Sequence, residues 1–87
     1  MLEDPNNRIY LKKESFVIPR EEQFGTYVSL FALGEPVTGL TLEGFFYPLR
    51  DYHMSGTDPL GVSNEITENV GKVYFSSGTL LVIESKD

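Results

Sequence analysis

Short apolar runs, broken about every eight to twelve residues by Gly, Pro, Asn or Asp, restrict most strongly how this chain folds. Apolar and polar residues often alternate within the runs, and no stretch shows the periodicity of an amphipathic helix. Strands and turns at this spacing are typical of antiparallel sandwiches and barrels. The pattern predicts an all-β fold and leaves the choice between sandwich and barrel open.

The clearest predicted strand covers residues 26–33, where both faces are largely apolar, so we expect it in the middle of a sheet. Residues 37–44 form a second strong candidate, whose glycines Gly39 and Gly44 indicate a bulge or a close approach of the backbone. Residues 72–75 and 79–83 are predicted to form a hairpin with Gly78 at positive φ. Further predicted segments are strands near 9–11, 15–18 and 60–66, a charged bend at 20–23 and a loop at 55–59.

The length of 87 residues predicts one small domain or a piece of a larger chain, and the polar, turn-rich start of the sequence indicates a boundary. We expect residues 1–8 to be a linker stump or a frayed N-terminus and residues 9–87 to be the domain. The chain has no Cys, which fits a reducing compartment and predicts a cytoplasmic protein. No apolar run approaches about 20 residues, so we expect no membrane span.

Charge and motif content argue against several classes of function. The formal net charge of −6 disfavours nucleic acid as a partner, because binding to phosphates requires clustered positive charge. His53 is the only His, and no carboxylate or His cluster has the spacing of a metal site. There is also no phosphate-binding Gly-rich motif and no Gly-x-Ser-x-Gly nucleophile motif. The residues therefore predict a binding or assembly domain without catalytic or metal-ligating side chains of its own.

Two parts of the sequence contain candidate binding residues. Tyr47 stands directly before Pro48 in a chain with six Phe and five Tyr, so it is either a ligand-stacking ring or a core or interface aromatic. Ser63 and Asn64 follow Gly61 in the segment DPLGVSNEIT. Their side chains either contact a ligand or cap the backbone of their own loop.

Four segments, in this order, resemble the C-terminal domain of bacterial thiamine pyrophosphokinases. They are YVSLFAL (27–33), VTGLTLEGFFYPL (37–49), LGVSNEI (60–66) and SGTLLVI (77–83). The second and third segments together are the most specific part of the resemblance, which extends over most of the chain. With the strand pattern, it predicts an antiparallel, jelly-roll-like β-sandwich of about eight short strands.

The resemblance also implies a function. Enzymes of this family join an N-terminal α/β domain, which binds Mg²⁺ and ATP, to a C-terminal β-sandwich that binds thiamine and forms the homodimer. The parent enzyme is then expected to transfer pyrophosphate from ATP to thiamine, giving thiamine diphosphate and AMP. This chain would be only the thiamine-binding part and inactive alone. The resemblance places Ser63 and Asn64 at the thiamine site, and Tyr47 where eukaryotic relatives carry Trp.

Two other functions remain open from the sequence. A stand-alone β-sandwich that binds another small molecule or a sugar would use the same exposed aromatic residues. A purely structural dimerisation domain would use Phe45, Phe46 and Tyr47 in its interface.

Overall fold

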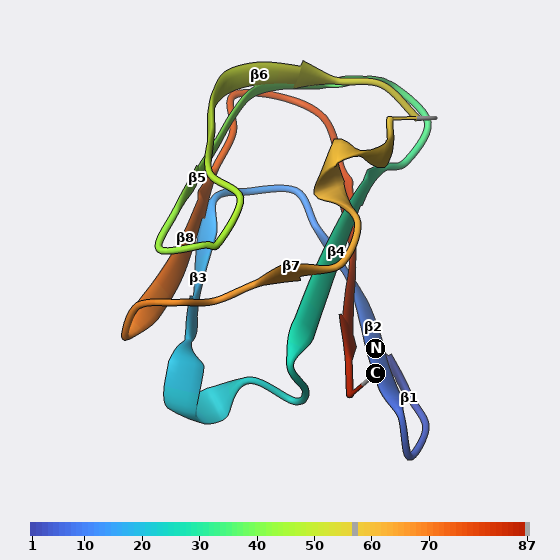
Figure 1. Ribbon diagram of the computed structural model, residues 1–87. Helices are drawn as coiled ribbons and strands as arrows, with labels where there is room; N and C mark the ends of the chain where they lie inside the picture. The colour runs from blue at the N-terminus through green and yellow to red at the C-terminus, as the bar shows by residue number, and fades with distance from the viewer. Residues whose placement is uncertain (57, 87) are drawn as a thin grey trace.

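Two antiparallel β-sheets form the domain, as the computed structural model shows for residues 1–56 and 58–86 (Figure 1). Thr57, within the predicted 55–59 loop, and Asp87, at the end of the predicted domain, lie outside the described residues. The described residues contain nine strands, where the sequence predicted about eight. They include no helix long and apolar enough to cross a membrane. The prediction of an all-β sandwich is confirmed.

The five-stranded sheet has the order β1-β2-β9-β4-β7, with every neighbouring pair antiparallel. Its strands are β1 (Leu2–Glu3), β2 (Asn7–Lys12), β9 (Leu80–Ser85), β4 (Tyr27–Ala32) and β7 (Asn64–Glu65). Strand β4 lies between β9 and the short β7, which confirms its predicted central position. The segment 1–8 contributes β1 and the start of β2.

The four-stranded sheet has the order β3-β8-β5-β6. Its strands are β3 (Phe16–Pro19), β8 (Val70–Tyr74), β5 (Val37–Glu43) and β6 (Leu49–Met54). The pairing of β5 with β6 shifts register between Val37 and Leu40, which confirms the bulge predicted near Gly39. Two short 3₁₀ turns, η1 (Arg20–Glu22) and η2 (Pro59–Gly61), lie in the connections, and η1 occupies the predicted charged bend.

The core forms where the alternating residues of the two sheets meet. Val28, Leu30 and Ala32 of β4 are buried, as are Leu40 and Leu42 of β5, so both strands face the way their patterns predict. The other members of the core cluster are Ile18, Val37, Phe45, Met54, Ile66, Val73, Leu80 and Val82. Burial of these apolar side chains is the main favourable contribution to folding in a chain without disulfides.

The predicted hairpin is wrong in its pairing. Strands β8 and β9 both exist, and Gly78 has the expected positive φ of 103°, but the two strands belong to different sheets. Strand β8 pairs with β3 and β5, whereas β9 pairs with β2 and β4. The turn at 75–79 therefore carries the chain from one sheet to the other. Strand β6 had no counterpart in the sequence prediction.

The outer face of the five-stranded sheet is apolar as well. In the registered rows of β2, β9 and β4, the residues that point away from the core include Ile9, Leu11, Phe31, Leu81 and Ile83. Leu11 is 51% exposed. The two chain ends lie together beside this sheet, where Lys86 N donates to Asn6 O over 3.0 Å (Figure 1). The sheet thus has two apolar faces, and the described residues bury one of them against the other sheet while they leave the second half-buried to exposed.

Candidate functional site

An apolar groove lies where the start of β6 meets η2. It has a volume of about 320 Å³ and is lined by Tyr47, Pro48, Leu49, Pro59, Leu60 and Val62. Tyr47 is 59% exposed and Leu60 is 52% exposed. A small-molecule site typically combines a concavity of this size with apolar walls and a few polar groups at its edge.

The turn η2 forms one wall of the groove and is held by Asp58 and Tyr52. Asp58 caps η2 by accepting from Leu60 N over 3.0 Å, and its other oxygen accepts from the hydroxyl of Tyr52 on β6. The bond from Tyr52 and, secondly, the bond from Leu60 N lower the pKa of Asp58. The same bond from Tyr52 to Asp58 raises the pKa of the Tyr52 hydroxyl.

Gly61 lets η2 lie close against the edge of β4. A Cβ at position 61 would come within 2.4 Å of Leu30 O, so only glycine fits here. This contact covers part of the β4 edge that the two-residue strand β7 leaves without a strand partner. Gly61 therefore fixes how deep the η2 wall sits.

Ser63 follows η2 in a left-handed conformation with φ of 54°, which is uncommon for a residue other than Gly. Its N–H donates to Ser29 Oγ on β4 over 2.9 Å, and its own side chain is exposed. The turn therefore presents the Ser63 side chain to solvent next to Val62 of the groove. The exposure of Ser63 is compatible with contact to a ligand, and its role in binding stays a prediction.

Asn64 lies beside Ser63 but is buried, with 1% of its surface exposed. Its Oδ1 accepts from Tyr47 N and Glu65 N, both over 2.9 Å, and its Nδ2 donates to Tyr47 O over 2.8 Å. The side-chain amide thus links two segments that are 17 residues apart in the sequence. Asn64 caps its own strand and holds Tyr47 as well.

Tyr47 stands at the edge of the groove with Phe46 beside it. The two rings meet edge to face, with centroids 4.7 Å apart and an interplanar angle of 87°, and each residue is 59% exposed. Neither residue belongs to the buried core, so the interpretation of Tyr47 as a core aromatic is excluded by its exposure. A ring in this position is free to stack on a flat ligand or on a partner protein.

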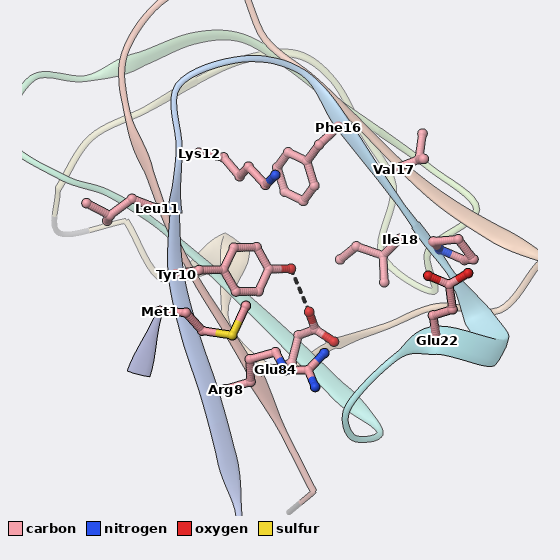
Figure 2. A pocket seen from close by; sticks show the side chains of 11 residues that line it. Met1, Arg8, Tyr10, Leu11, Lys12, Phe16, Val17, Ile18, Glu22 and Glu84 are labelled. Atoms are coloured by element: carbon pink, nitrogen blue, oxygen red, sulfur yellow. Dashed lines mark hydrogen bonds between the residues drawn. The ribbon is translucent and has the colours of Figure 1, made fainter. Parts of the chain in front are cut away.

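A second cavity, of about 300 Å³, opens between β2 and β3 (Figure 2). Glu84 is 3% exposed there and accepts from the Tyr10 hydroxyl over 2.6 Å and from Phe24 N over 2.9 Å. Burial and the bond to Glu84 raise the pKa of Tyr10. The Lys12 ammonium lies 5.5 Å from the Phe16 ring centroid, and both side chains line the cavity (Figure 2). These contacts tie β2, β9 and the segment before β4 together.

The described residues do not fit a metal ion. Across residues 1–56 and 58–86, no group of three or more His, Cys, Asp or Glu is placed to hold one. The Mg²⁺ that the family resemblance implies therefore has no such ligand set among these residues.

The structure brings the three sequence-predicted residues together. Asn64 bonds to the backbone of Tyr47, Ser63 is its neighbour, and the groove lies between Tyr47 and Val62. Sequence reasoning missed Ser29, Tyr52 and Asp58, which support this site. For Asp58 a signal existed, because Asp followed by Pro is a common start of a helical turn. Ser29 gave no signal, since it lies inside an apolar strand.

Comparison with known proteins identifies the family. The family described as "Thiamin pyrophosphokinase, vitamin B1 binding domain" matches residues 14–80. The thiamine pyrophosphokinase of Bacillus subtilis (strain 168) is 38% identical over 61 residues, which cover 70% of this chain and 28% of that protein. The chain therefore spans little more than a quarter of this curated relative.

Solved structures of the same family share the fold over almost the whole chain. The crystal structure of thiamine pyrophosphokinase from Bacillus subtilis superposes with a TM-score of 0.90 and 32% identity, covering 98% of this chain and 40% of that one. The enzyme from Geobacillus thermodenitrificans gives a TM-score of 0.85 with the same identity and coverage. The matched region includes β3 to β8 and every residue of the groove. The chain therefore belongs to the family of vitamin B1 binding domains of thiamin pyrophosphokinases.

Proposed function

We propose that this chain binds thiamine in the groove between Tyr47 and Val62, as the substrate-binding domain of a thiamine pyrophosphokinase. The observation that carries the proposal is an apolar groove of about 320 Å³ with an exposed aromatic ring at its edge, in a chain of the vitamin B1 binding domain family. Ser63 and Tyr47 supply an exposed hydroxyl and an exposed ring, and the buried Asn64, bonded to the backbone of Tyr47, is the third residue that we assign to the site.

The chemistry of thiamine suits such a groove. Thiamine has two flat rings, a pyrimidine and a positively charged thiazolium, which stack on aromatic side chains and pack against apolar walls. The Ser63 hydroxyl can donate and accept, as the ring nitrogens and the amino group of the pyrimidine require. The net charge of −6 favours a cationic ligand over an anionic one.

The whole parent enzyme transfers pyrophosphate from ATP to the thiamine hydroxyl, giving thiamine diphosphate and AMP. ATP and Mg²⁺ are held mainly by an N-terminal α/β domain. The connection from that domain ends in residues 1–8, whose β1 and start of β2 join the sheet of the thiamine-binding domain formed by residues 9–87. The reaction depends on metal-assisted charge stabilisation and on in-line positioning of the two substrates. This domain supplies the positioning of thiamine. We place the enzyme in the cytoplasm, because a chain without Cys fits a reducing compartment.

Replacing the exposed ring tests the site. In the full-length parent, Tyr47→Ala should weaken thiamine binding by roughly three- to tenfold, because stacking and cation–π contacts contribute about 0.5–1.5 kcal/mol. Tyr74→Ala is the matched control, since Tyr74 is an exposed Tyr on β8, away from the groove. Calorimetric titration with thiamine measures both. Equal affinities for the two variants would rule out this groove, and failure of the unaltered parent to bind thiamine would favour a sandwich for another small molecule or a sugar.

The 87-residue chain alone should form no thiamine diphosphate from ATP, Mg²⁺ and thiamine. Pyrophosphoryl transfer without the ATP- and metal-binding domain lacks its main stabilisation of charge. A chromatographic assay for thiamine diphosphate, with a protein-free blank, measures this. Thiamine diphosphate formed by the pure chain above the blank would contradict the assignment of ATP and Mg²⁺ binding to a separate N-terminal domain.

The parent enzyme is a homodimer that pairs through this domain. The outer face of the five-stranded sheet supports this interface, since its central rows, Leu11–Leu81–Phe31 and Ile9–Ile83–Ser29, contain five apolar residues, one Ser and no charged residue. In a chain of net charge −6, central rows without a charged side chain let two copies approach with little like-charge repulsion, since Glu65, in register with Tyr27, lies on the edge strand β7. Sheet-on-sheet packing at about 10 Å would cover it.

A further inference from the structure

The side chain of Asn64 continues a strand pairing that the main chain leaves unfinished. Residues 44–46 and 65–67 run antiparallel, with Thr67 N donating to Gly44 O and Phe46 N donating to Glu65 O, each over 2.8 Å. At the next position, the Asn64 amide accepts from Tyr47 N and donates to Tyr47 O. An amide side chain has the donor and acceptor of a peptide group, so Asn64 gives Tyr47 both bonds of a paired strand residue.

The burial of Asn64 separates its role from that of Tyr47. Asn64 is 1% exposed, and its Oδ1 already accepts two hydrogen bonds while its Nδ2 donates one. Tyr47 is 59% exposed and borders the groove. The polar amide is therefore directed to the backbone, and the aromatic ring is the group presented to a ligand.

We infer that Asn64 is a positioning residue of the proposed thiamine site, acting through the main chain of Tyr47 and not by contact with thiamine. The inference rests on the proposed function, because it assigns Tyr47 to the ligand. It differs from a simple capping role because the bonds to Tyr47 fix where the aromatic ring stands.

The position of Tyr47 in the chain makes this support necessary. Pro48 follows and has no N–H, so the main-chain ladder cannot continue beyond Tyr47. An exposed aromatic residue at the end of a ladder is free to change its backbone conformation unless its N–H and C=O are held. A ring that is ordered before the ligand arrives loses less conformational entropy on binding.

A fluorescent reporter tests the positioning directly. The chain has no Trp, so Tyr47→Trp introduces a single indole at the site. Adding Asn64→Ala in this background should lower the fluorescence anisotropy of the introduced indole and increase its quenching by acrylamide. Asn69→Ala, at an exposed Asn outside the groove, is the matched control and should leave both values unchanged. An anisotropy that is equal with and without Asn64→Ala, in folded protein, would overturn the inference.

Thiamine affinity provides the second readout. In the full-length parent, Asn64→Ala should weaken thiamine binding by roughly three- to tenfold, because the hydrogen bonds that hold the Tyr47 backbone are lost. A purely structural role would lower the melting temperature and leave the affinity of the folded protein unchanged, which would overturn the inference. The anisotropy measurement contains no thiamine, so it decides the positioning of the ring at position 47 even if the unaltered parent fails to bind thiamine and the proposed function falls.

The unaltered chain offers a test that does not depend on whether Asn64→Ala folds. The Tyr47 amide is predicted to exchange its hydrogen at least about a hundredfold more slowly than an unprotected amide, because it is bonded to a buried side chain. Exchange at the rate of an open loop would show that Asn64 does not hold Tyr47 and would overturn the inference.

Discussion

At the scale of single residues, the candidate site depends on side chains that bond to main-chain groups. Asn64 bonds to the backbone of Tyr47, and Ser29 accepts from the backbone of Ser63. Both supporting residues are buried, while Tyr47 is largely exposed and the Ser63 side chain faces solvent. A buried polar group that satisfies a main-chain partner fixes the partner's position, since breaking the bond leaves an unpaired group in the interior.

Ser29→Ala should lower the free energy of unfolding by about 0.5–1.5 kcal/mol, because Ser63 N–H loses its acceptor in a partly buried place. Ser63 has a left-handed backbone conformation, which is energetically unfavourable for a residue with a Cβ and adds to the need for the bond to Ser29. Urea denaturation measures the change. Ser85→Ala is the control, since Ser85 lies on the same outer face of the sheet on β9. Equal stability of the two variants would show that the Ser29 hydroxyl does not support the turn.

The sequence alone could indicate Ser63, Asn64 and Tyr47 as candidates, but not how each would act. The resemblance placed all three at one site, and the structure brings them together. The direction of the Asn64 amide depends on a pairing between segments 17 residues apart, and nothing in the local sequence reports that pairing. The role of Ser29 could not be predicted for the same reason, because its partner Ser63 lies 34 residues away in the sequence.

At the scale of elements, the turn η2 shows how one short segment shapes the groove. Asp58 caps η2 and accepts from Tyr52 of β6, so the four-stranded sheet and the groove wall are connected. Gly61 sets the contact of η2 with β4. The groove therefore depends on both sheets, although most of its lining belongs to the segments between strands.

The bond from Tyr52 to Asp58 should make stability depend on pH. Because the folded pKa of Asp58 is lowered, its contribution is present above the unfolded value of 3.8 and is lost as the pH falls through the folded pKa. The raised pKa of Tyr52 affects stability at alkaline pH. Its contribution to the free energy of unfolding is present below the unfolded pKa of 10.0 and is lost as the pH rises through the folded pKa. The melting temperature of Asp58→Asn should thus differ from that of the unaltered chain most at neutral pH.

Melting curves of the two proteins at about pH 6 and about pH 3 measure this difference. It should shrink at the lower pH, where Asp58 of the unaltered chain becomes protonated. Tyr52→Phe is a second informative variant. It removes the hydroxyl that is the larger cause of the lowered pKa of Asp58, so the melting temperature of this variant should depend less on pH between these two values. A difference that stays constant between the two pH values would contradict a role for the ionised Asp58.

Most strands were predicted from the sequence, but the strand predicted at 60–66 was largely wrong, since Pro59–Gly61 form η2 and only Asn64–Glu65 pair as β7. The pairing predicted for β8 and β9 was wrong as well. The alternating residues of β4 and β5 face the core as expected. The predicted hairpin of β8 and β9 failed because a short loop with a glycine at positive φ serves equally well to cross between two sheets. Alternation reports which face of a strand is buried, but it does not report which strand lies beside it. Strand β6 was missed because Arg50, Asp51 and His53 interrupt any apolar pattern.

At the scale of the whole molecule, the two sheets differ in the charge and polarity of their outer faces. The four-stranded sheet carries Lys72 on β8 and Glu43 on β5, paired directly with each other, at exposed positions. The five-stranded sheet instead presents an apolar row formed by Leu11, Leu81 and Phe31. An apolar face of this kind on a small acidic domain marks a surface that another protein covers. This asymmetry is why we propose the five-stranded sheet, and not the four-stranded one, as the surface for a homodimer.

A charge placed on that face tests the homodimer. Leu11 is 51% exposed, so Leu11→Glu should not disturb the folded monomer. In a face-to-face dimer it would bury a carboxylate in each copy without a partner, which costs several kcal/mol per ion. Sedimentation of the full-length parent at tens of micromolar should therefore show a dimer for the unaltered protein and a monomer for Leu11→Glu. Val17→Glu, at a similarly exposed position (53%) on β3 of the other sheet, is the matched control and should remain dimeric. A monomeric unaltered parent would refute the dimer, whereas dissociation of Val17→Glu but not of Leu11→Glu would move the interface to the four-stranded sheet.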